Sequence, residues 1–231
     1  MAAVLARVLV GFLVGFLVGL PVSALPGVLA GAVTLAGAVA APRIVAAQIV
    51  SQAEVQTGIF GLEARGSRFV YVFDRSASMA EPDGRPLARA KEELLRSLDQ
   101  LGDVQQFYII FYNERMQLFT PGAARRLIFA TEDTKRAARR FVESVPAAGG
   151  TRHAEPLAAA LRLSPDVIFM LTDGDEADDL AAEEHAKLGE SLGRTRCMIV
   201  QFGGDGAVRS PRLARLATQS GGSYTVVNAA E

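Results

Sequence analysis

Short, uninterrupted apolar runs recur along this 231-residue chain from residue 69 onward, and FVYVF (69–73) is the first of them. A strand that is apolar on both faces has to be covered on both faces, which is typical of the central strands of a parallel sheet. The runs predict six strands, the third of them a short edge strand, at residues 69–73, 106–112, 116–119, 166–172, 196–203 and 223–228.

Helical patterns separate these strands. The clearest, at residues 86–101, places Leu and Ala on one stripe with Pro86 in the first turn. The segment 131–145 opens with a threonine cap and an acidic first turn. Further helices are expected at residues 153–163, 176–192 and 211–220. This alternation predicts an α/β fold, a doubly wound, mainly parallel six-stranded sheet with helices on both faces.

Polar side chains follow two of the predicted strands, where ligands of doubly wound sheets bind. Asp74, Ser76 and Ser78 follow the first strand, Asp173 follows the strand at 166–172, and Thr151 stands in a glycine-led loop before a helix. If those two strands are neighbours, the five side chains converge at one edge. Two carboxylates and three hydroxyls suit Mg²⁺ or Mn²⁺, with Ca²⁺ as a further possibility. Such an ion keeps positive charge and an open position, which an incoming carboxylate can fill.

The same residues resemble the metal-ion-dependent adhesion site of the von Willebrand factor type A domain. The family pattern is D-x-S-x-S, a distant threonine and a T-D-G-type aspartate; here it reads DRSASM (74–79), GGTRH (149–153) and TDG (172–174). The resemblance implies a Rossmann-like domain over residues 67–231. It also implies that both serines and Thr151 bind the ion directly, and that the two aspartates bind it directly or through water. The partner is then expected to be a protein that presents Asp or Glu.

Two departures from the family pattern stand out. Ala77 occupies a position that is usually glycine, so the loop has to accept a Cβ atom. Members of the family usually carry a helix after the last strand, whereas only three residues follow Asn228. We therefore expect the segment before residue 60 to cover the surface that this helix would occupy.

A membrane segment is expected at residues 1–43. The 35 residues between Arg7 and Arg43 carry no formal charge, and one helix of that length, roughly 50 Å, would exceed a hydrocarbon core of about 30 Å. Pro21 and Pro26 therefore suggest two short transmembrane helices, at residues 8–24 and 26–42. A single span or a cleaved signal peptide are alternatives. Residues 44–66 are expected to form a stalk helix. We expect the protein to be located at the cell membrane. The sequence does not decide on which side of the membrane its soluble domain lies.

Other functions fit the sequence less well. A net charge of −1 with scattered basic residues gives no indication of nucleic-acid binding, and no small-molecule substrate is expected. Ser76, His153 and Asp173 could name a hydrolase triad, but no G-x-S-x-G elbow is present and the chain order is wrong for that fold. We therefore expect that this protein is not an enzyme. A metal-dependent hydrolase and a domain whose metal is only structural remain alternatives to a membrane-anchored, bacterial-type binding protein.

Overall fold

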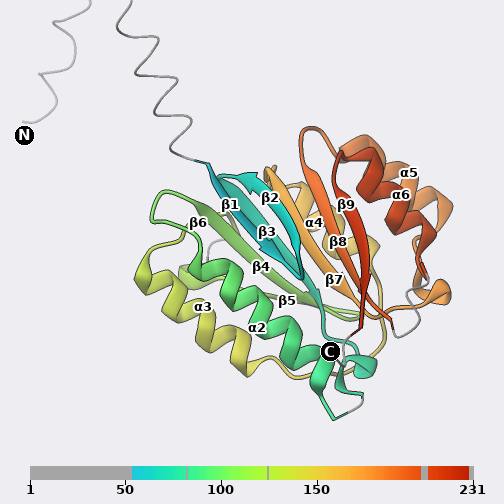
Figure 1. Cartoon of the computed structure of the whole chain (residues 1–231), viewed down its shortest axis with the longest axis horizontal. Helices are drawn as coiled ribbons and strands as arrows, with labels where there is room; N and C mark the ends of the chain where they lie inside the picture. The colour runs from blue at the N-terminus through green and yellow to red at the C-terminus, as the bar shows by residue number, and fades with distance from the viewer. Residues whose placement is uncertain (1–53, 82, 124, 204–207, 229–231) are drawn as a thin grey trace, which may run out of the picture. The chain divides into compact units, whose positions relative to one another are not determined.

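The computed structural model describes residues 54–81, 83–123, 125–203 and 208–228. Its main sheet has the strand order β5-β4-β3-β7-β8-β9, and β6 pairs with the start of β4 (Figure 1). The parallel strands are β3 (Arg68–Asp74), β4 (Gln106–Tyr112), β7 (Val167–Thr172), β8 (Arg196–Phe202) and β9 (Ser223–Val227), and the antiparallel ones are β5 (Met116–Leu118) and β6 (Ile128–Phe129). The predicted mainly parallel α/β sheet is confirmed, and the two-residue β6 adds a strand that the sequence did not predict.

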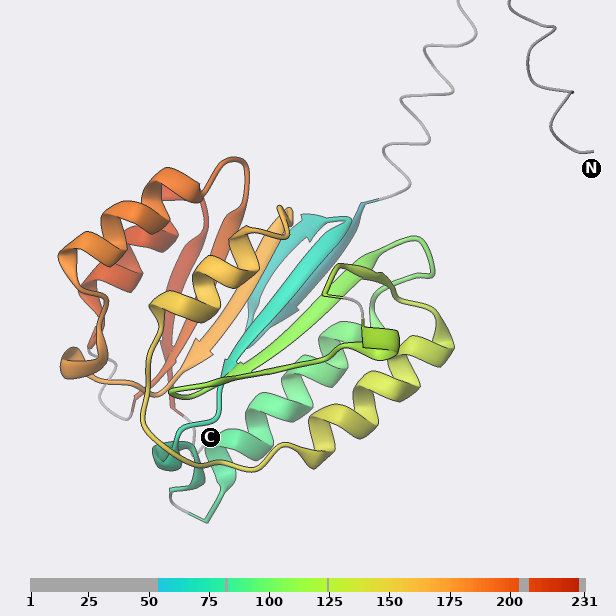
Figure 2. The same ribbon diagram turned by 180° about the vertical axis from the view of Figure 1, so that it is seen from behind.

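Helices cover both faces of this sheet. Their bounds are α2 (Arg85–Asp99), α3 (Glu132–Ser144), α4 (Ala154–Leu161), α5 (Ala182–Ser191) and α6 (Pro211–Gln219). Side chains from α2 and α3 pack on one face, and side chains from α4, α5 and α6 pack on the other (Figure 2). The carboxyl ends of the parallel strands therefore stay uncovered along one edge.

The single helix predicted at residues 176–192 is confirmed over α5 and wrong over its first residues. A 3-10 turn at Glu176–Asp178 precedes α5, and the break between them contains Asp179. The Asp179 carboxylate accepts hydrogen bonds from the backbone N–H groups of Arg212 and Leu213, at 2.9 and 3.2 Å. The backbone of Asp179 is not helical, with ψ of 156°, so the helix is interrupted at the residue whose carboxylate caps the start of α6.

The stalk helix predicted at residues 44–66 is also wrong over its described part. The chain forms β1 (Val55–Ile59) and β2 (Leu62–Gly66), an antiparallel hairpin with a two-residue loop. Both loop residues, Phe60 and Gly61, have positive φ (46° and 77°), as in the turns that close tight hairpins. Buried and exposed residues alternate along both strands, which is the strand period and not the helical one. Residues 44–53 lie outside the described residues.

The hairpin belongs to the domain core. Ile59 and Ala64 are buried in the same apolar cluster as β3, α2 and α3. The buried Thr57 hydroxyl lies 2.7 Å from that of Ser97 on α2. The Phe60 ring packs edge-on against Phe202, with centroids 5.2 Å apart. The face beside α2 is therefore covered by a hairpin instead of the expected helix, and the folded domain includes Val55–Gly66, upstream of the predicted boundary at residue 67.

The predicted membrane spans at residues 8–24 and 26–42 lie outside the described residues. Within the part of the chain that the structure describes, no helix is both long enough and apolar enough to cross a bilayer.

A carboxylate clamp holds the start of β3 at the edge opposite the site. Asp166 Oδ2 accepts hydrogen bonds from the backbone N–H groups of Ser67 and Arg68 and from the Ser67 hydroxyl, and Oδ1 accepts two from the Arg68 guanidinium. Burial acts to raise the pKa of Asp166, but the hydrogen bonds from Arg68 and Ser67 outweigh it and hold the pKa below its ordinary value. The ionised carboxylate therefore stabilises the folded state.

We expect Asp166→Asn to lower the free energy of unfolding by about 2 kcal/mol at pH 7, because the amide cannot accept all of these bonds. Since folding lowers the pKa of Asp166, its contribution is present above about pH 4 and is lost as the pH falls through the folded-state value. Urea unfolding at pH 7 and pH 3 checks this, because the two proteins should differ at pH 7 and converge at pH 3. An equal difference at both pH values would contradict the assignment.

Candidate metal site

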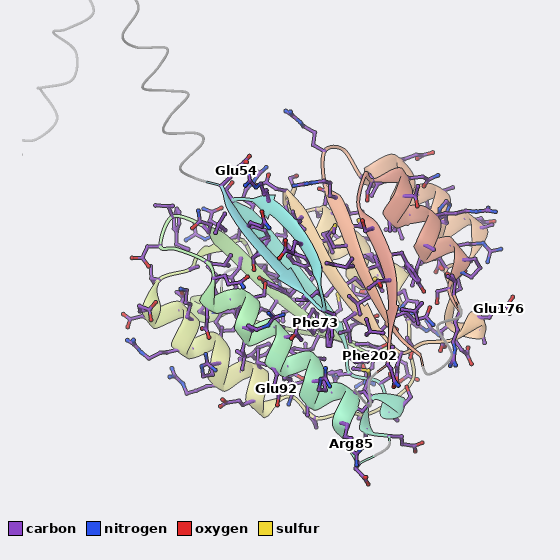
Figure 3. All side chains as sticks on the ribbon, in the orientation of Figure 1. Glu54, Phe73, Arg85, Glu92, Glu176 and Phe202 are labelled. Carbon is purple, nitrogen blue, oxygen red and sulfur yellow. The ribbon has the colours of Figure 1, made fainter. Side chains whose placement is uncertain are left out.

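The two strands that carry the candidate ligands are neighbours. β3 pairs with β7 in parallel, with Phe73 opposite Leu171, so Asp74 and Thr172 both end their strands at the same edge. The predicted ligands were expected to converge if these two strands were neighbours, and this condition is met. Figure 3 shows the edge by its labelled residues Phe73 and Phe202, and Glu54 lies at the opposite edge of the sheet.

Three oxygen atoms form a compact triangle at this edge. Ser76 Oγ and Ser78 Oγ lie 3.0 Å apart, and Asp173 Oδ1 lies 3.3 Å from the first and 2.9 Å from the second. Adjacent ligands of an octahedral Mg²⁺ ion, with Mg–O distances of about 2.0–2.1 Å, are about 2.9–3.0 Å apart. The triangle therefore has the dimensions of one face of such an octahedron.

Asp74 lies behind this triangle and is fully buried. Its Oδ1 accepts a 2.8 Å hydrogen bond from the backbone N–H of Ser76, and its Oδ2 accepts a 2.7 Å bond from the Thr172 hydroxyl. The Thr172 Oγ1 atom in turn accepts a bond from the backbone N–H of Gly174, at 2.9 Å. Asp74 thus ties the Ser76 loop to the loop that carries Asp173.

Thr172 belongs to the candidate site by its hydrogen bond to Asp74, and sequence reasoning missed it as a site member. Its signal was its place as the last residue of a buried strand, directly before Asp173. A buried hydroxyl at that position needs a partner, and the strand pairing supplies Asp74.

The loop that carries Thr151 reaches the serine loop through its backbone. Ala77 donates to the carbonyl of Gly149 at 2.9 Å, and Ala148 donates to the carbonyl of Arg75 at 2.8 Å. Thr151 itself is half-buried, and within the described chain its hydroxyl makes no hydrogen bond to the other four predicted ligands. The structure therefore brings four of the five residues into direct contact and places Thr151 two residues beyond one of the contacts.

The departure at Ala77 is accommodated. Ala77 begins a 3-10 turn (Ala77–Ala80) and is exposed, so its Cβ points away from the buried side of the loop. By contrast, Gly149 has φ of +80°, and a Cβ atom there would come within 2.7 Å of Asn113 Nδ2. The close backbone approach thus requires glycine in the Thr151 loop but not at position 77.

His153 lies next to the site without forming the triad considered from the sequence. It stands at the N-cap position of α4, but its side chain makes no capping bond. Its Nδ1 atom lies 3.0 Å from the hydroxyl of Tyr112, and its Nε2 atom has no hydrogen-bond partner among the described residues. Ser76 contacts Ser78 and Asp173 instead. These side chains do not make a nucleophile–base pair.

The fold agrees with comparisons to known proteins. Residues 67–226 match the family described as von Willebrand factor type A domain. This chain belongs to that family. The von Willebrand factor type A domain is typically a protein-interaction module.

Individual relatives cover this domain and extend beyond it. Human inter-alpha-trypsin inhibitor heavy chain H4 is 28% identical in an alignment of 179 residues, and this alignment covers 70% of this chain and 18% of that protein. A von Willebrand factor type A structure from Catenulispora acidiphila is 21% identical, with a TM-score of 0.62 over 75% of this chain and 43% of its own. Proximal thread matrix protein 1 from the mussel byssus is 18% identical, with a TM-score of 0.53 and coverage of 71% and 42%. This chain therefore spans less than half of each of these relatives.

The rim of the site in this von Willebrand factor type A domain has a structural part and an exposed part. Asn113 Oδ1 accepts from the backbone N–H of Arg115, two residues further on, as asparagine side chains do in turns. Arg75 reaches the carbonyl of Pro146 and Asn113 Oδ1, both at 3.4 Å, so it packs against the Thr151 loop. Glu114 and Arg152 are exposed.

Burial dominates the electrostatics of the site. It raises the pKa of Asp74 to about 7, although hydrogen bonds from Ser76 and Thr172 oppose the rise, and nearby Asp173 adds to it. Burial also raises the pKa of Asp173, against the hydrogen bonds from Ser78 and Ser76. Burial lowers the pKa of His153 to about 4, against the opposing charge of Asp179. The aspartates thus carry charge that a cation at this edge would stabilise. Within the described chain, no group of three or more His, Cys, Asp or Glu side chains is placed to hold a metal ion. A metal ion at this edge would therefore need the hydroxyl oxygens as ligands.

A pH dependence follows for the protein in EDTA. Folding raises the pKa of Asp74, so the stabilisation is full below about pH 4 and is lost as the pH rises through about 7. We expect Asp74→Asn to gain about 1–2 kcal/mol of unfolding free energy relative to the wild type between pH 4 and pH 8, because the amide carries no charge to bury, whereas the acceptor that Ser76 or Thr172 loses is lost at both pH values. Urea unfolding in EDTA at the two pH values measures this. A difference between the two proteins that is the same at pH 4 and pH 8 would contradict it.

Proposed function

We propose that this domain binds a protein partner through a divalent metal ion, Mg²⁺ in the first instance, held by Asp74, Ser76, Ser78, Thr151 and Asp173. The observation that carries the proposal is the triangle of Ser76 Oγ, Ser78 Oγ and Asp173 Oδ1, whose edges of 2.9–3.3 Å suit one face of an octahedral ion. Mn²⁺ forms similar octahedra, and Ca²⁺ is the less favoured alternative.

The donor set supports capture of an acidic side chain. Among the described residues, only one carboxylate, that of Asp173, touches both serine hydroxyls. The Asp74 carboxylate is buried and already accepts from Ser76 and Thr172, so it acts through these residues or through water. An ion with few charged ligands keeps net positive charge and attracts a further carboxylate. An Asp or Glu of the partner is therefore the expected ligand.

The hydrogen bonds around the site favour this role over a purely structural metal. The Ser76, Thr151 and Asp173 loops are already joined by the Ala77–Gly149, Asp74–Ser76 and Asp74–Thr172 hydrogen bonds. An ion is thus not needed to tie the loops together. We further propose that residues 8–42 attach the domain to the cell membrane, because that uncharged segment is long enough for two short spans.

Calorimetric titration of the full chain with Mg²⁺ tests the metal site. We expect the wild type to bind one ion and the Ser76→Ala/Ser78→Ala double variant to bind at least tenfold more weakly, because two neutral ligands are lost. Ser223→Ala, an exposed serine on β9, is the matched control and should bind as the wild type does. Equal affinity for all three proteins would refute the site.

Partner capture is tested separately. The full chain, immobilised in detergent, is exposed to a library of peptides that differ only in carrying Asp, Glu, Asn or Gln at one position. We expect retention of the Asp and Glu peptides in Mg²⁺ and their release in EDTA, with the amides not retained. Binding that is the same in Mg²⁺ and EDTA would remove the metal from the recognition step.

A further inference from the structure

His153 occupies the space directly behind the candidate metal site. It is buried, with 2% of its surface exposed, and it follows Thr151 by two residues at the start of α4. The only hydrogen-bond partner of its ring among the described residues is the Tyr112 hydroxyl, 3.0 Å from Nδ1. A buried imidazole with a single partner is a costly group to keep in a core, so its position calls for an explanation.

Tyr112 connects this histidine to the serine loop. It is fully buried at the end of β4, and it is the register partner of Asp74 on β3. Its carbonyl accepts a 2.7 Å hydrogen bond from the backbone N–H of Arg75, the residue between Asp74 and Ser76. The backbone of Tyr112 therefore holds the serine loop, while its hydroxyl holds His153.

The other side of the ring meets the Asp173 loop. A Cβ atom built on Gly174 would lie 3.1 Å from His153 Nε2 and 3.1 Å from Thr172 Oγ1. Glycine therefore lets the backbone after Asp173 approach the imidazole closely. The same backbone is held by the bond from the Gly174 N–H to Thr172 Oγ1. Three segments that carry candidate ligands, at residues 74–78, 151 and 173, thus converge on one side chain and its tyrosine.

We propose that His153 is a positioning residue of the metal site, anchored by Tyr112, and that it sets the distance from Thr151 to the triangle formed by Ser76, Ser78 and Asp173. This inference rests on the proposed metal-binding function. Thr151 lacks a hydrogen bond to the other candidate ligands within the described chain, so its placement depends on the residues that fix its loop. Among these, the ring of His153 bonds to Tyr112, whose carbonyl holds the serine loop, and its Nε2 atom lies beside Gly174, next to Asp173.

The competing explanation is that His153 only fills space in the core. Three variants separate the explanations. Tyr112→Phe removes one oxygen atom and keeps both rings in place. His153→Asn keeps a polar atom near the position of Nδ1, whereas His153→Leu has nearly the same size and cannot bond to Tyr112.

The measurements are the Mg²⁺ dissociation constant of the full chain by calorimetry and its unfolding midpoint in EDTA. We expect Tyr112→Phe and His153→Leu to weaken Mg²⁺ binding about tenfold, as loss of a residue that orients a metal ligand commonly does. His153→Asn should restore the affinity to within about threefold of the wild type.

Three results would overturn the inference. The first is an unchanged Mg²⁺ affinity in Tyr112→Phe. The second is equal affinity in the Asn and Leu variants. The third is a lowered midpoint in EDTA with no change in affinity, which is the signature of packing alone. If the wild type binds no Mg²⁺, the proposed function fails together with the inference. If the wild type binds and the variants bind equally well, only the role of His153 fails.

Discussion

Asp173→Ala abolishes Mg²⁺ binding if the triangle is the metal site, and the expected loss in affinity is at least about 100-fold, or about 2.7 kcal/mol. The reason is that Asp173 supplies the one carboxylate that contacts both Ser76 Oγ and Ser78 Oγ, at 3.3 and 2.9 Å. Two hydroxyls and a remote carboxylate compete poorly with the water ligands that Mg²⁺ gives up reluctantly. Calorimetric titration of the full chain measures the affinity, and the loss of the Mg²⁺-induced shift in unfolding temperature gives a second readout.

Asp175→Ala is the matched control for this variant. Asp175 lies two residues further on and is exposed, and its carboxylate caps a 3-10 turn by accepting from the backbone N–H of Ala177 at 2.8 Å. It should cost some local stability and leave the Mg²⁺ affinity unchanged. If both aspartates proved equally important, the effect would come from general negative charge at this edge, and the assignment of Asp173 as a ligand would be wrong.

Ile59→Ala is expected to lower the free energy of unfolding by about 3 kcal/mol, the second large effect. Ile59 is the last residue of β1, fully buried in the cluster that also contains Phe69, Leu94 and Phe202. Its truncation leaves a cavity between the hairpin, α2 and the sheet. Urea unfolding of the full chain measures the loss, and the slope of the transition should stay close to that of the wild type.

Glu63→Ala provides the comparison for the hairpin. Glu63 is exposed on β2, and its side chain bonds only to Gln56 among the described residues. We expect a change below about 0.5 kcal/mol. A hairpin that is not part of the cooperative domain would give a different result, since Ile59→Ala would then leave the main transition unchanged.

The uninterrupted apolar runs account for most of the correct fold prediction. The runs at residues 69–73 and 166–172 are apolar on both faces, and the structure places them side by side at the centre of the sheet as β3 and β7. That pairing could not be deduced from either run alone, because strand order depends on how the connecting helices cross. The two-residue β6 escaped notice because so short a strand has no period to detect.

The hairpin was missed for a local reason. Alternation along Val55–Ile59 and Leu62–Gly66 is a strand signal, but the segment mixes apolar and polar residues without a proline, which is also compatible with a helix. Its tight turn places Phe60 at positive φ, where Asn or Asp would have made the turn recognisable. Tertiary packing of Phe60 against Phe202 compensates for this unusual choice, and such a contact cannot be seen in the sequence.

At the site, the residue types at strand ends predicted which side chains converge. They did not predict which of these side chains bond to one another. Asp74, Ser76, Ser78 and Asp173 converge as the polar pattern suggested. The bond between Thr172 and Asp74 depends on the register of β3 with β7, and the bond between Tyr112 and His153 depends on where α4 begins. Neither register nor helix start is encoded by local composition.

The hairpin also determines how the domain would respond to a pulling force. Val55, where the described chain enters β1, is paired with Gly66, which leads directly into the central strand β3. A force on the chain before Glu54 would therefore act on adjacent ends of the two hairpin strands and separate their pairs one after another, beginning with Val55 and Gly66. The central strands, bonded in parallel on both sides, would be loaded only after the hairpin had opened. We therefore expect the hairpin to unfold under force before the edge that bears Asp74 and Asp173 is disturbed.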